Sequence, residues 1–386
     1  MDMRKEFMQR LAAGERMTDL CHEYGISRKT AYKFKLRFEK LGVEGLADQA
    51  RVPRVTPHKT PPEVEEVIVA ERRLHPTWGP RKLKAVLERR LDRPFPSPSG
   101  IGAVLSRHGL TQPRKRRHRH VPTPTTLREA TAPNDVWCID YKGQFRLGDG
   151  TYCYPLTITD QCSRYILGCD GMAAISDEEA REACREVFLA HGLPAVMRSD
   201  NGVPFSSTGL AGLTKLSAMW LRLGIRLERI RPAHPEENGQ HERMHRTLKF
   251  ETARPARANL LQQQERFDDF VDEFNTVRPH EGIGMKRPAD VYVRSVRSFQ
   301  GVVPEPKYPT YDDVLRVNRC GQLYVPSVGQ VALSNALAGE RVGIREGRDG
   351  RWLINFCGVD LGHAGPHRRT FTPLAAAKST AASGGA

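Results

Sequence analysis

Three acidic residues lie in segments where a carboxylate calls for an explanation: two predicted strands and a predicted helix. Asp140 stands in the apolar stretch "VWCIDY", Asp200 ends the stretch "AVMRSD", and Glu242 lies in the helical pattern "QHERMHRTLK". A carboxylate inside an apolar strand is unfavourable unless a partner neutralises it. Convergent carboxylates repel one another unless cations bind between them, and such hard oxygen ligands suit Mg²⁺ or Mn²⁺. Two such ions about 4 Å apart support phosphodiester chemistry, because they activate the attacking oxygen and stabilise the leaving one.

This interpretation requires the three segments to meet in the fold. We expect this if the strands carrying Asp140 and Asp200 are neighbours in one sheet and the helix carrying Glu242 packs across that sheet. Each acid also has an ordinary alternative. Asp140 would then be a hydrogen-bonding group at a strand end, Asp200 a residue of the turn "SDNG", and Glu242 part of a solvated helix face.

The sequence around Glu242 predicts one polar face on its helix. Arg246 and Lys249 follow Glu242 by four and seven residues, so all three side chains share that face. One carboxylate beside two cations suits a metal next to a DNA backbone, and we predict that Arg246 and Lys249 bind DNA. An internal salt bridge between Glu242 and Arg246 is the alternative. His241 and His245 either touch DNA or are simply exposed.

Two pairs of residues near this helix are assigned to loop structure. Asn238 and Gly239 are expected to form the hinge of the loop before the helix. Arg278 and His280, in "TVRPHEG", are expected to hold that loop in place and to take no part in chemistry.

Residues 134–298 show the pattern of a mixed α/β domain. Runs rich in β-branched and aromatic residues predict three successive strands, then two more that alternate with helices. Ser176 marks a helix start and Gly192 its end. The expected strands are 135–145, 152–161, 164–172, 194–200 and 225–230, and the expected helices are 176–192, 213–224, 237–251 and 260–282.

Residues 1–50 are predicted to form a helix-turn-helix DNA-binding domain. Gly25 separates two helical stretches, and Ser27 is placed to cap the second. An apolar stripe at helical spacing and an outward polar face are what groove and phosphate contacts require. A plain helical hairpin with a solvated cationic face is the alternative. The stripe comprises Ala31, Phe34, Phe38 and Leu41, and the predicted DNA-binding residues are Arg28, Lys29, Tyr32 and Lys33.

A second helical module is predicted at residues 63–112. Trp78 lies at the joint of two helices, Ser97 and Pro98 start a third, and Gly109 closes it. We expect this module to bind DNA as well, with a structural spacer as the alternative.

Two linkers flank this module. Residues 51–62 are Pro-rich and basic. Residues 113–133 contain the run "PRKRRHRH", which is typical of a phosphate clamp or a disordered tail. Its position between two domains favours the clamp, with Arg114, Lys115, Arg116 and Arg117 as its DNA-binding residues.

The C-terminal part of the chain has a third composition. Residues 299–372 contain short strand-like runs at nearly regular spacing with Gly turns, which predicts a small β-barrel. Residues 373–386 are of low complexity, and we expect a disordered tail. Together the patterns predict N-terminal all-α modules, a central α/β core and a C-terminal β domain.

Composition limits the partners of the chain. Among 386 residues, 60 are Lys or Arg and 45 are Asp or Glu, giving a net charge of +15 that favours a polyanionic partner such as nucleic acid. The N-terminus lacks the apolar core of a signal peptide, and no apolar run is long enough to span a membrane. We therefore expect an intracellular protein with no membrane partner. The sequence contains no Gly-rich phosphate loop followed by Lys and Ser or Thr, so no motif supports a kinase-like role.

The motifs in combination resemble a known family. "WCIDY", "SDNG", "RPAHPEENGQHERMHRTLKFE" and "FNTVRPHEGIG" are similar to bacterial insertion-sequence transposases with a retroviral-integrase core. That resemblance implies an RNase H-like core, with Asp140, Asp200 and Glu242 as the catalytic and metal-binding DDE residues. It also implies two Mg²⁺ or Mn²⁺ ions per active site, double-stranded DNA as partner, a homo-oligomer on DNA, and a cytoplasmic, nucleoid-associated location.

The reaction implied by the resemblance has two steps. A metal-activated water would cleave at the transposon end, and the freed 3′-hydroxyl would then attack target DNA. Two competing functions stay open at this point. The first is an inactive DNA-binding regulator, and the second is an RNase H-type nuclease acting on RNA–DNA hybrids.

The spacing of the acids departs from the integrase pattern. The 41 residues between Asp200 and Glu242 form a longer gap than that pattern has, so Glu236 and Glu237 fit the spacing better. They precede the Asn-Gly pair, however, whereas the family's glutamate follows it. No His and Cys cluster precedes the core, and we expect no structural zinc.

Overall fold

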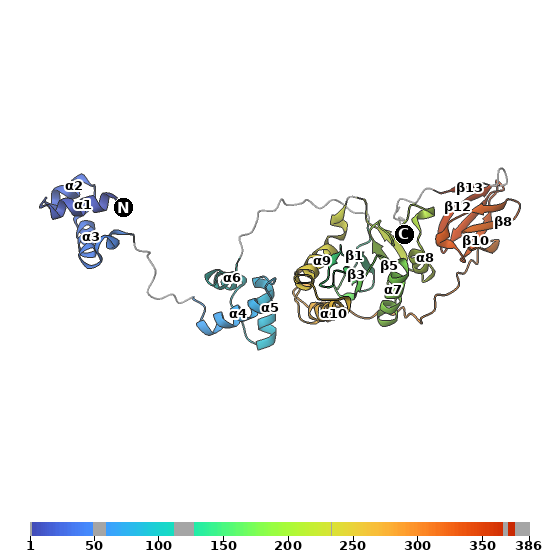
Figure 1. Cartoon of the computed structure of the whole chain (residues 1–386), viewed down its shortest axis with the longest axis horizontal. Helices are drawn as coiled ribbons and strands as arrows, with labels where there is room; N and C mark the ends of the chain where they lie inside the picture. The colour runs from blue at the N-terminus through green and yellow to red at the C-terminus, as the bar shows by residue number, and fades with distance from the viewer. Residues whose placement is uncertain (1, 49–58, 112–126, 233, 366–369, 375–386) are drawn as a thin grey trace, which may run out of the picture. The chain divides into compact units, whose positions relative to one another are not determined.

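The computed structural model describes residues 2–48, 59–111, 127–232, 234–365 and 370–374. The chain divides into two compact units, residues 1–61 and 62–386, which are described separately. Figure 1 labels the helices and strands along the chain. The predicted phosphate clamp at residues 114–117, most of the first linker and nearly all of the predicted disordered tail lie outside the described residues.

The N-terminal unit is helical, as predicted. Its elements are α1 (Asp2–Ala12), α2 (Met17–Glu23), α3 (Arg28–Leu41) and the 3-10 turn η1 (Gly42–Leu46). The Ser27 side chain caps α3 by accepting a hydrogen bond from the Thr30 amide.

The apolar stripe of α3 was predicted correctly except at its end. Ala31 is buried, and Phe34 and Phe38 pack on the same core, but Leu41 is 58% exposed. The helix ends at Leu41, and Gly42 turns the chain with a φ of 61°. The chain then returns through η1, so Leu46 is the leucine buried in this core.

The second helical module has the three predicted helices. They are α4 (Pro62–Leu74), α5 (Pro80–Leu91) and α6 (Pro98–Arg107). Trp78, between α4 and α5, is fully buried in the centre of the module. The Ser97 side chain accepts from the Gly100 amide and caps α6, and Gly109 follows the helix with a φ of 67°.

A mixed sheet forms the centre of the second unit. Its strands are β1 (Val136–Tyr141), β2 (Phe145–Arg146), β3 (Tyr152–Asp160), β4 (Ile166–Met172), β5 (Val196–Ser199) and β6 (Arg226–Arg229). The order is β2-β3-β1-β5-β6, and β4 pairs with β3. β1 pairs with β3 antiparallel and with β5 parallel, and β5 pairs with β6 parallel. The strands that carry Asp140 and lead to Asp200 are therefore neighbours, as the metal interpretation requires.

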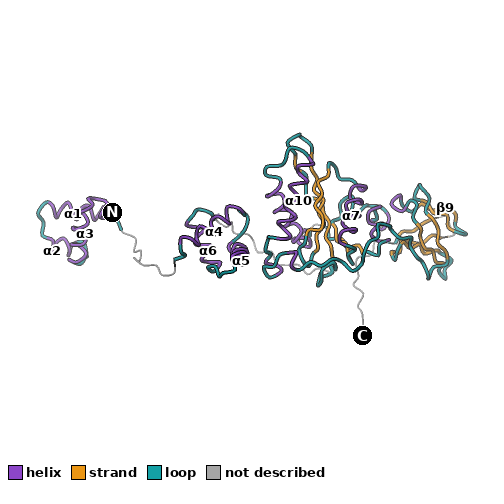
Figure 2. Tube along the Cα trace, turned by 90° about the horizontal axis from the view of Figure 1, so that it is seen from below, coloured by secondary structure: helices purple, strands orange, loops and turns teal. Residues whose placement is uncertain are grey.

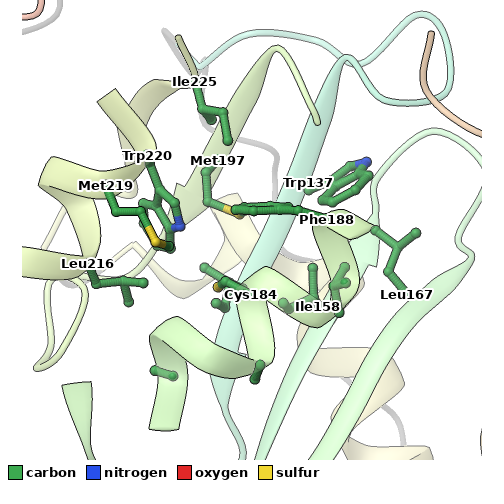
Figure 3. Packing of buried hydrophobic residues seen from close by; sticks show 14 of the residues in the cluster. Trp137, Ile158, Leu167, Cys184, Phe188, Met197, Leu216, Met219, Trp220 and Ile225 are labelled. Carbon is green, nitrogen blue, oxygen red and sulfur yellow. The ribbon is translucent and has the colours of Figure 1, made fainter. Parts of the chain in front are cut away.

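Helices cover both faces of this sheet. They are α7 (Asp177–His191), α8 (Lys215–Arg222), α9 (Gly239–Thr252) and α10 (Leu260–Thr276). Figure 2 shows the strands edge-on between α10 and α7. On one face Trp137 packs with Phe188 of α7 and Trp220 of α8 (Figure 3). On the other, Met244 of α9 and Phe267 of α10 form a separate core. Short 3-10 turns lie at η2 (Leu210–Gly212), η3 (Pro235–Asn238), η4 (Glu281–Ile283) and η5 (Pro288–Asp290).

The C-terminal β domain is confirmed as a β structure, but its ladders do not close. A five-stranded sheet has the order β13-β12-β11-β10-β7, and β8 and β9 form a separate two-stranded ribbon. Apolar residues of both, such as Leu323 of β8 and Ile344 of β10, share one core. Within the described residues the two sheets therefore pack as layers and no hydrogen-bonded barrel forms. The strands are β7 (Asp313–Arg316), β8 (Gln322–Val325), β9 (Gly329–Ala332), β10 (Arg341–Glu346), β11 (Trp352–Phe356), β12 (Val359–Gly365) and β13 (Thr370–Pro373), with η6 (Asn335–Leu337) between β9 and β10.

None of the helices in these described ranges has both the length and the apolar character that crossing a membrane requires.

Candidate active site

The register of two parallel strands brings Asp140 and Asp200 side by side. Cys138 of β1 pairs with Arg198 of β5. Asp140 lies two residues beyond that pair in β1, and Asp200 follows directly after the end of β5 (Val196–Ser199), at the corresponding point of the neighbouring strand. The charge of Asp200 acts on the Asp140 carboxyl group, whose side chain belongs to the face covered by α9 and α10. Ile139, the chain neighbour of Asp140, belongs to the α7 and α8 face.

Asp200 sits in a turn that fixes its side chain. Its Oδ1 accepts a hydrogen bond of 3.0 Å from the Gly202 amide. A Cβ added at Gly202 would lie only 3.1 Å from Asp200 Oδ2, so a side chain there would crowd the carboxylate. The ordinary turn interpretation of Asp200 therefore describes its conformation correctly, and the same turn presents the acid beside Asp140.

Glu242 lies in the first turn of α9 and is exposed. A helix N-terminus favours a negative charge. The side of α9 next to Glu242 is buried against the sheet through His241, Met244, His245, Leu248 and Thr252. Because these residues recur at helical spacing, they fix the rotation of α9 and turn Glu242 away from the apolar contact.

The contact between α9 and β3 is polar at its centre. Thr157, the β3 partner of Asp140, donates to the Asp140 carbonyl at 3.2 Å. Its Oγ1 lies 2.7 Å from His241 Nε2 and 2.6 Å from His245 Nε2. With the Thr157 hydroxyl donating to the carbonyl, both imidazoles donate from Nε2. The Thr159 hydroxyl then donates to His241 Nδ1 at 2.8 Å.

Both histidines are buried, which overturns the prediction that they are exposed or touch DNA. Burial lowers the pKa of His241 to about 3, and Lys142 adds to the shift. Burial also lowers the pKa of His245, with further contributions from His241 and Lys142. Both rings are therefore neutral near pH 7. The spacing of four residues, in phase with Met244 and Leu248, is the sequence signal that indicates a buried pair.

Asp140 is the acid that interacts with both of the others. Burial raises the pKa of Asp140 to about 7, and the negative charges of Asp200 and Glu242 raise it too, while Lys142 opposes the shift. Its Oδ2 also lies 3.7 Å from His245 Nδ1. Since that nitrogen carries a lone pair in the hydrogen-bond arrangement above, two acceptors face each other. A proton or a metal ion relieves both the crowded charge and this mismatch.

The positions and chemistry of the possible ligand atoms indicate which residues could hold a metal ion. Among the described residues, the ligand atoms of Asp140, His241 and His245 all lie within 4.8 Å of one another. Asp200 and Glu242 are not in that group. His241 is unsuited as a ligand, because threonine hydroxyls already occupy both of its nitrogens. The oxygen donors near Asp140 are hard ligands that fit Mg²⁺ or Mn²⁺, and His245 Nδ1 is a further donor beside them.

The charged face of α9 carries the two cations predicted to bind DNA. Arg246 is exposed and Lys249 is half-buried. Within the described part of the chain, no ion pair joins Glu242 to Arg246, so the salt-bridge alternative is not observed.

Glu237, a rival for the role of Glu242, is engaged elsewhere. Its carboxylate accepts hydrogen bonds from the Arg231 amide at 2.7 Å and from Arg231 Nε at 2.6 Å. The Glu237 side chain is only 2% exposed. Glu236 lies in the same turn, η3, and its side chain falls outside the described residues.

Arg278 contacts residues of α9, α10 and the helical module. Its Nη1 lies 3.0 Å from Oε1 of Glu251 on α9, and its guanidinium stacks over the Trp78 and Phe274 rings. His280 packs on the Phe274 ring, with 4.5 Å between ring centroids. Arg278 therefore links the C-terminal half of α9 to the helical module, and the expected role of both residues in holding the loop before α9 stays a prediction.

The predicted DNA-binding side chains of α3 face outward. Arg28, Lys29, Tyr32 and Lys33 are all exposed. The clamp residues Arg114, Lys115, Arg116 and Arg117 lie outside the described residues.

Family comparisons agree with this architecture. Residues 130–235 and 223–288 match two family models, each described as an integrase core domain. Residues 3–54 match a helix-turn-helix domain, and residues 30–105 match a homeodomain-like domain. Over these ranges the chain is therefore similar to integrase core domains and to helix-turn-helix domains.

The related curated proteins are viral polyproteins. The chain is 30% identical over 172 residues to the Gag-Pol polyprotein of baboon endogenous virus (strain M7), covering 44% of this chain and 9% of that protein. It is 31% identical over 117 residues to the Pol polyprotein of feline endogenous virus ECE1, covering 30% and 10%. The chain thus spans about a tenth of the length of these relatives.

Similar solved structures are retroviral integrases. The HTLV-2 integrase catalytic core domain in complex with magnesium covers 43% of this chain and 100% of its own, at 14% identity and a TM-score of 0.34. The simian T-cell lymphotropic virus intasome in complex with PP2A regulatory subunit B56 gamma covers 74% of this chain and 100% of its own, at 15% identity and a TM-score of 0.38.

Proposed function

We propose that this protein is a transposase that binds the DNA ends of a mobile element, cleaves their 3′ strands and transfers them to target DNA. The observation that carries the proposal is the pairing of β1 with β5, which sets Asp140 beside Asp200 on the face covered by the helix of Glu242. The integrase core domain and the helix-turn-helix matches support the same function.

We assign metal binding to the three acids. Asp140, whose pKa is raised by the charges of Asp200 and Glu242, would hold the metal together with these two acids. When bound, Mg²⁺ or Mn²⁺ supplies activation of the attacking oxygen and stabilisation of the leaving oxygen. Residues of the chain position these acids: Thr157 of β3 donates to the Asp140 carbonyl, His245 of α9 places Nδ1 beside the Asp140 carboxylate, and the Gly202 amide orients Asp200.

The proposed reaction needs no covalent intermediate with the enzyme. A water first opens the phosphodiester bond at the 3′ end of the element, and the freed 3′-hydroxyl then attacks a target phosphodiester in line. The protein contributes position and charge stabilisation. Arg246 and Lys249, on the Glu242 face of α9, would hold the DNA backbone next to the acids.

DNA binding, assembly and location belong to the same proposal. The helix-turn-helix domain, the second helical module and the basic linker would hold duplex DNA. Two ends must be brought together, so we propose a homo-oligomer on DNA. We also propose a cytoplasmic, nucleoid-associated location in a bacterium.

Nicking of DNA that carries the sequences flanking the coding region tests the proposal. With Mg²⁺ present, the unaltered protein should nick this DNA and Asp140→Asn should not. Glu265→Gln is the matched control, because Glu265 is an exposed acid of α10 in the same core. Equal nicking by Asp140→Asn and the unaltered protein would remove the assignment. Tight DNA binding by both without nicking would favour the inactive regulator, and preferred cleavage of an RNA–DNA hybrid would favour the RNase H-type nuclease.

A further inference from the structure

A cavity of about 380 Å³ lies beside the polar network of α9 but holds none of the three acids. Its walls come from β1, the turn after β3, α9, and the segment that follows α10. His241 borders both this cavity and the Thr157 network. The cavity is therefore a separate feature of the same core.

The charged residues that line the cavity are mostly cations. Its two acids are Asp160, which is buried, and Glu281, which is exposed. The Asp160 carboxylate already accepts from the Ser163 amide and hydroxyl and from the Asn134 amide. It is thus largely satisfied by neutral donors. The cations are Lys82, Arg164, Arg243, Arg246 and Arg278.

Arg164 has a donor that lacks a partner. Its Nη1 is buried, and no described residue accepts a hydrogen bond from it. Burial, reinforced by Arg243, lowers the pKa of Arg164, yet a guanidinium stays protonated in proteins. A buried, charged donor without an acceptor is costly, so an acceptor at this point would be favourable.

The surroundings of Arg164 keep its guanidinium at the cavity wall. A Cβ added at Gly282 would lie 3.4 Å from Arg164 Nη2, so the glycine leaves room for the planar group. Arg164 also borders a neighbouring hollow of about 430 Å³, which includes Lys286. That hollow also includes Glu129.

A second unpartnered atom borders the same cavity. His280 Nε2 is buried and has no hydrogen-bond partner among the described residues. Burial lowers the pKa of His280 to about 3, and the charges of Lys82, Arg278 and Arg164 add to the shift. Three cations therefore act on one neutral ring, which is the local field that an anion would neutralise.

We propose that this cavity is a phosphate-binding site built around Arg164. A phosphate group offers several acceptor oxygens to the guanidinium fork, and its negative charge offsets the repulsion among the cations. A backbone phosphate of DNA and a free phosphate share this chemistry. The site is distinct from the metal cluster and stands whether or not that cluster cleaves DNA.

Phosphate binding to the full-length protein tests the site. Affinity is measured by titration calorimetry in two arms, inorganic phosphate and a short single-stranded oligonucleotide, at constant ionic strength. Arg164→Met should weaken inorganic phosphate binding about tenfold or more, since a charge-assisted hydrogen bond is lost. Arg146→Met is the matched control, because Arg146 is an exposed arginine of β2 outside the cavity, and it should bind like the unaltered protein.

The two arms separate the sources. If Arg164→Met weakens the binding of inorganic phosphate, the site binds the free anion. If Arg164→Met weakens only the binding of the oligonucleotide, the site binds a backbone phosphate of a strand that is also held elsewhere. Equal affinities for Arg164→Met and Arg146→Met in both arms would overturn the proposal. Asp140→Asn should leave phosphate binding unchanged, which separates this site from the metal cluster.

Two further variants keep the test valid if Arg164→Met fails to fold. Arg164→Lys retains the charge but not the fork, and should weaken binding less than Arg164→Met. Arg243→Met removes an exposed cation of α9, and should weaken phosphate binding about threefold by reducing the local positive charge. An unchanged affinity in Arg243→Met, with Arg164→Lys also unchanged, would reject the site.

Discussion

His245 Nδ1 lies 3.7 Å from Asp140 Oδ2, while the other nitrogen of the same ring lies 2.6 Å from the Thr157 hydroxyl. The ring is held by β3 and presents a lone pair to the acid of β1. His245 therefore joins the helix of Glu242 to the strand of Asp140 at the point where a metal would bind.

The first prediction concerns this pair. His245→Phe keeps the ring volume but removes the nitrogen, and should weaken the apparent affinity for Mg²⁺ about tenfold, as the loss of outer partners of metal ligands does. Thr157→Val, which leaves Nδ1 in place, should have a smaller effect. The checks are the Mg²⁺ dependence of nicking and the Mg²⁺-dependent rise in melting temperature. An unchanged Mg²⁺ dependence in His245→Phe would show that the ring only packs.

The second prediction separates two glutamates. Glu242→Gln should lower the rate of Mg²⁺-dependent nicking about a thousandfold, because losing a metal ligand removes several kcal/mol of stabilisation. Glu237→Gln should alter the rate far less, because Glu237 is already bonded to Arg231. Single-turnover nicking rates measure both. The reverse order of effects would transfer the metal-binding role to Glu237.

The third prediction uses the pKa of Asp140, which is raised from 3.8 to about 7 in the metal-free protein. Between these values the folded state binds more protons than the unfolded state, so Asp140 makes folding less favourable as the pH rises, and its full cost is present above about pH 7. In EDTA, Asp140→Asn should thus raise the free energy of unfolding by on the order of 2 kcal/mol at about pH 8 and by little at about pH 4. Denaturant unfolding across this range measures it. A gain that is the same at both pH values would contradict the charge-based explanation.

The fourth prediction concerns the strand that delivers Asp200. Arg198 of β5 is buried, and its Nη2 lies 2.6 Å from Glu228 Oε2. Arg198→Met should destabilise the core by about 3 kcal/mol, because it leaves the Glu228 charge without its partner. Denaturant unfolding measures the change. The double variant Arg198→Met, Glu228→Leu should recover part of it, and Arg226→Met, at an exposed position of β6, should stay within about 0.5 kcal/mol of the unaltered protein.

The fifth prediction tests the DNA-binding face of α3. Lys33→Ala should weaken duplex DNA binding and reduce the slope of log K against log salt by about one, as the loss of one phosphate contact does. Lys40→Ala, at an exposed position near the other end of the same helix, should leave both quantities unchanged. Binding measured over a series of salt concentrations provides the check. Equal slopes for both variants would place the DNA contact away from the start of α3.

Much of the fold could be predicted because it follows from local patterns. Ser27, Ser97 and Ser176 cap the helices that they were expected to cap. Runs rich in β-branched and aromatic residues predicted the long strands, and the helix-turn-helix and mixed α/β classes are confirmed. Leu41 was misplaced because helix periodicity contains no information on where the chain turns back, and Gly42 ends the helix directly after it. Strand spacing predicted a β-barrel, but the described strands form two separate sheets, because closure depends on which strand edges pair and spacing does not specify this.

The candidate site depended on longer-range information. Sequence patterns identified Asp140, Asp200 and Glu242 as chemically notable, but His241 and His245 were expected to touch DNA or to be exposed. Their burial follows from the rotation of α9, which the apolar contacts of Met244 and Leu248 set. Glu237 fits the integrase spacing better than Glu242, and spacing alone does not separate the two. The hydrogen bonds between Glu237 and Arg231, which only the tertiary structure shows, separate them.

The amino-acid sequence by itself determined the identity of the acids, the type of each main element and the strongly basic character of the chain, because these depend on residue type and local periodicity. The tertiary structure alone decided that β1 lies beside β5 in the register that aligns Asp140 with Asp200, and that Arg164 ends in a cavity without an acceptor. Strand pairing and cavity formation depend on contacts between residues far apart in the chain. Such contacts are set by the packing of the whole core, which local sequence patterns do not specify.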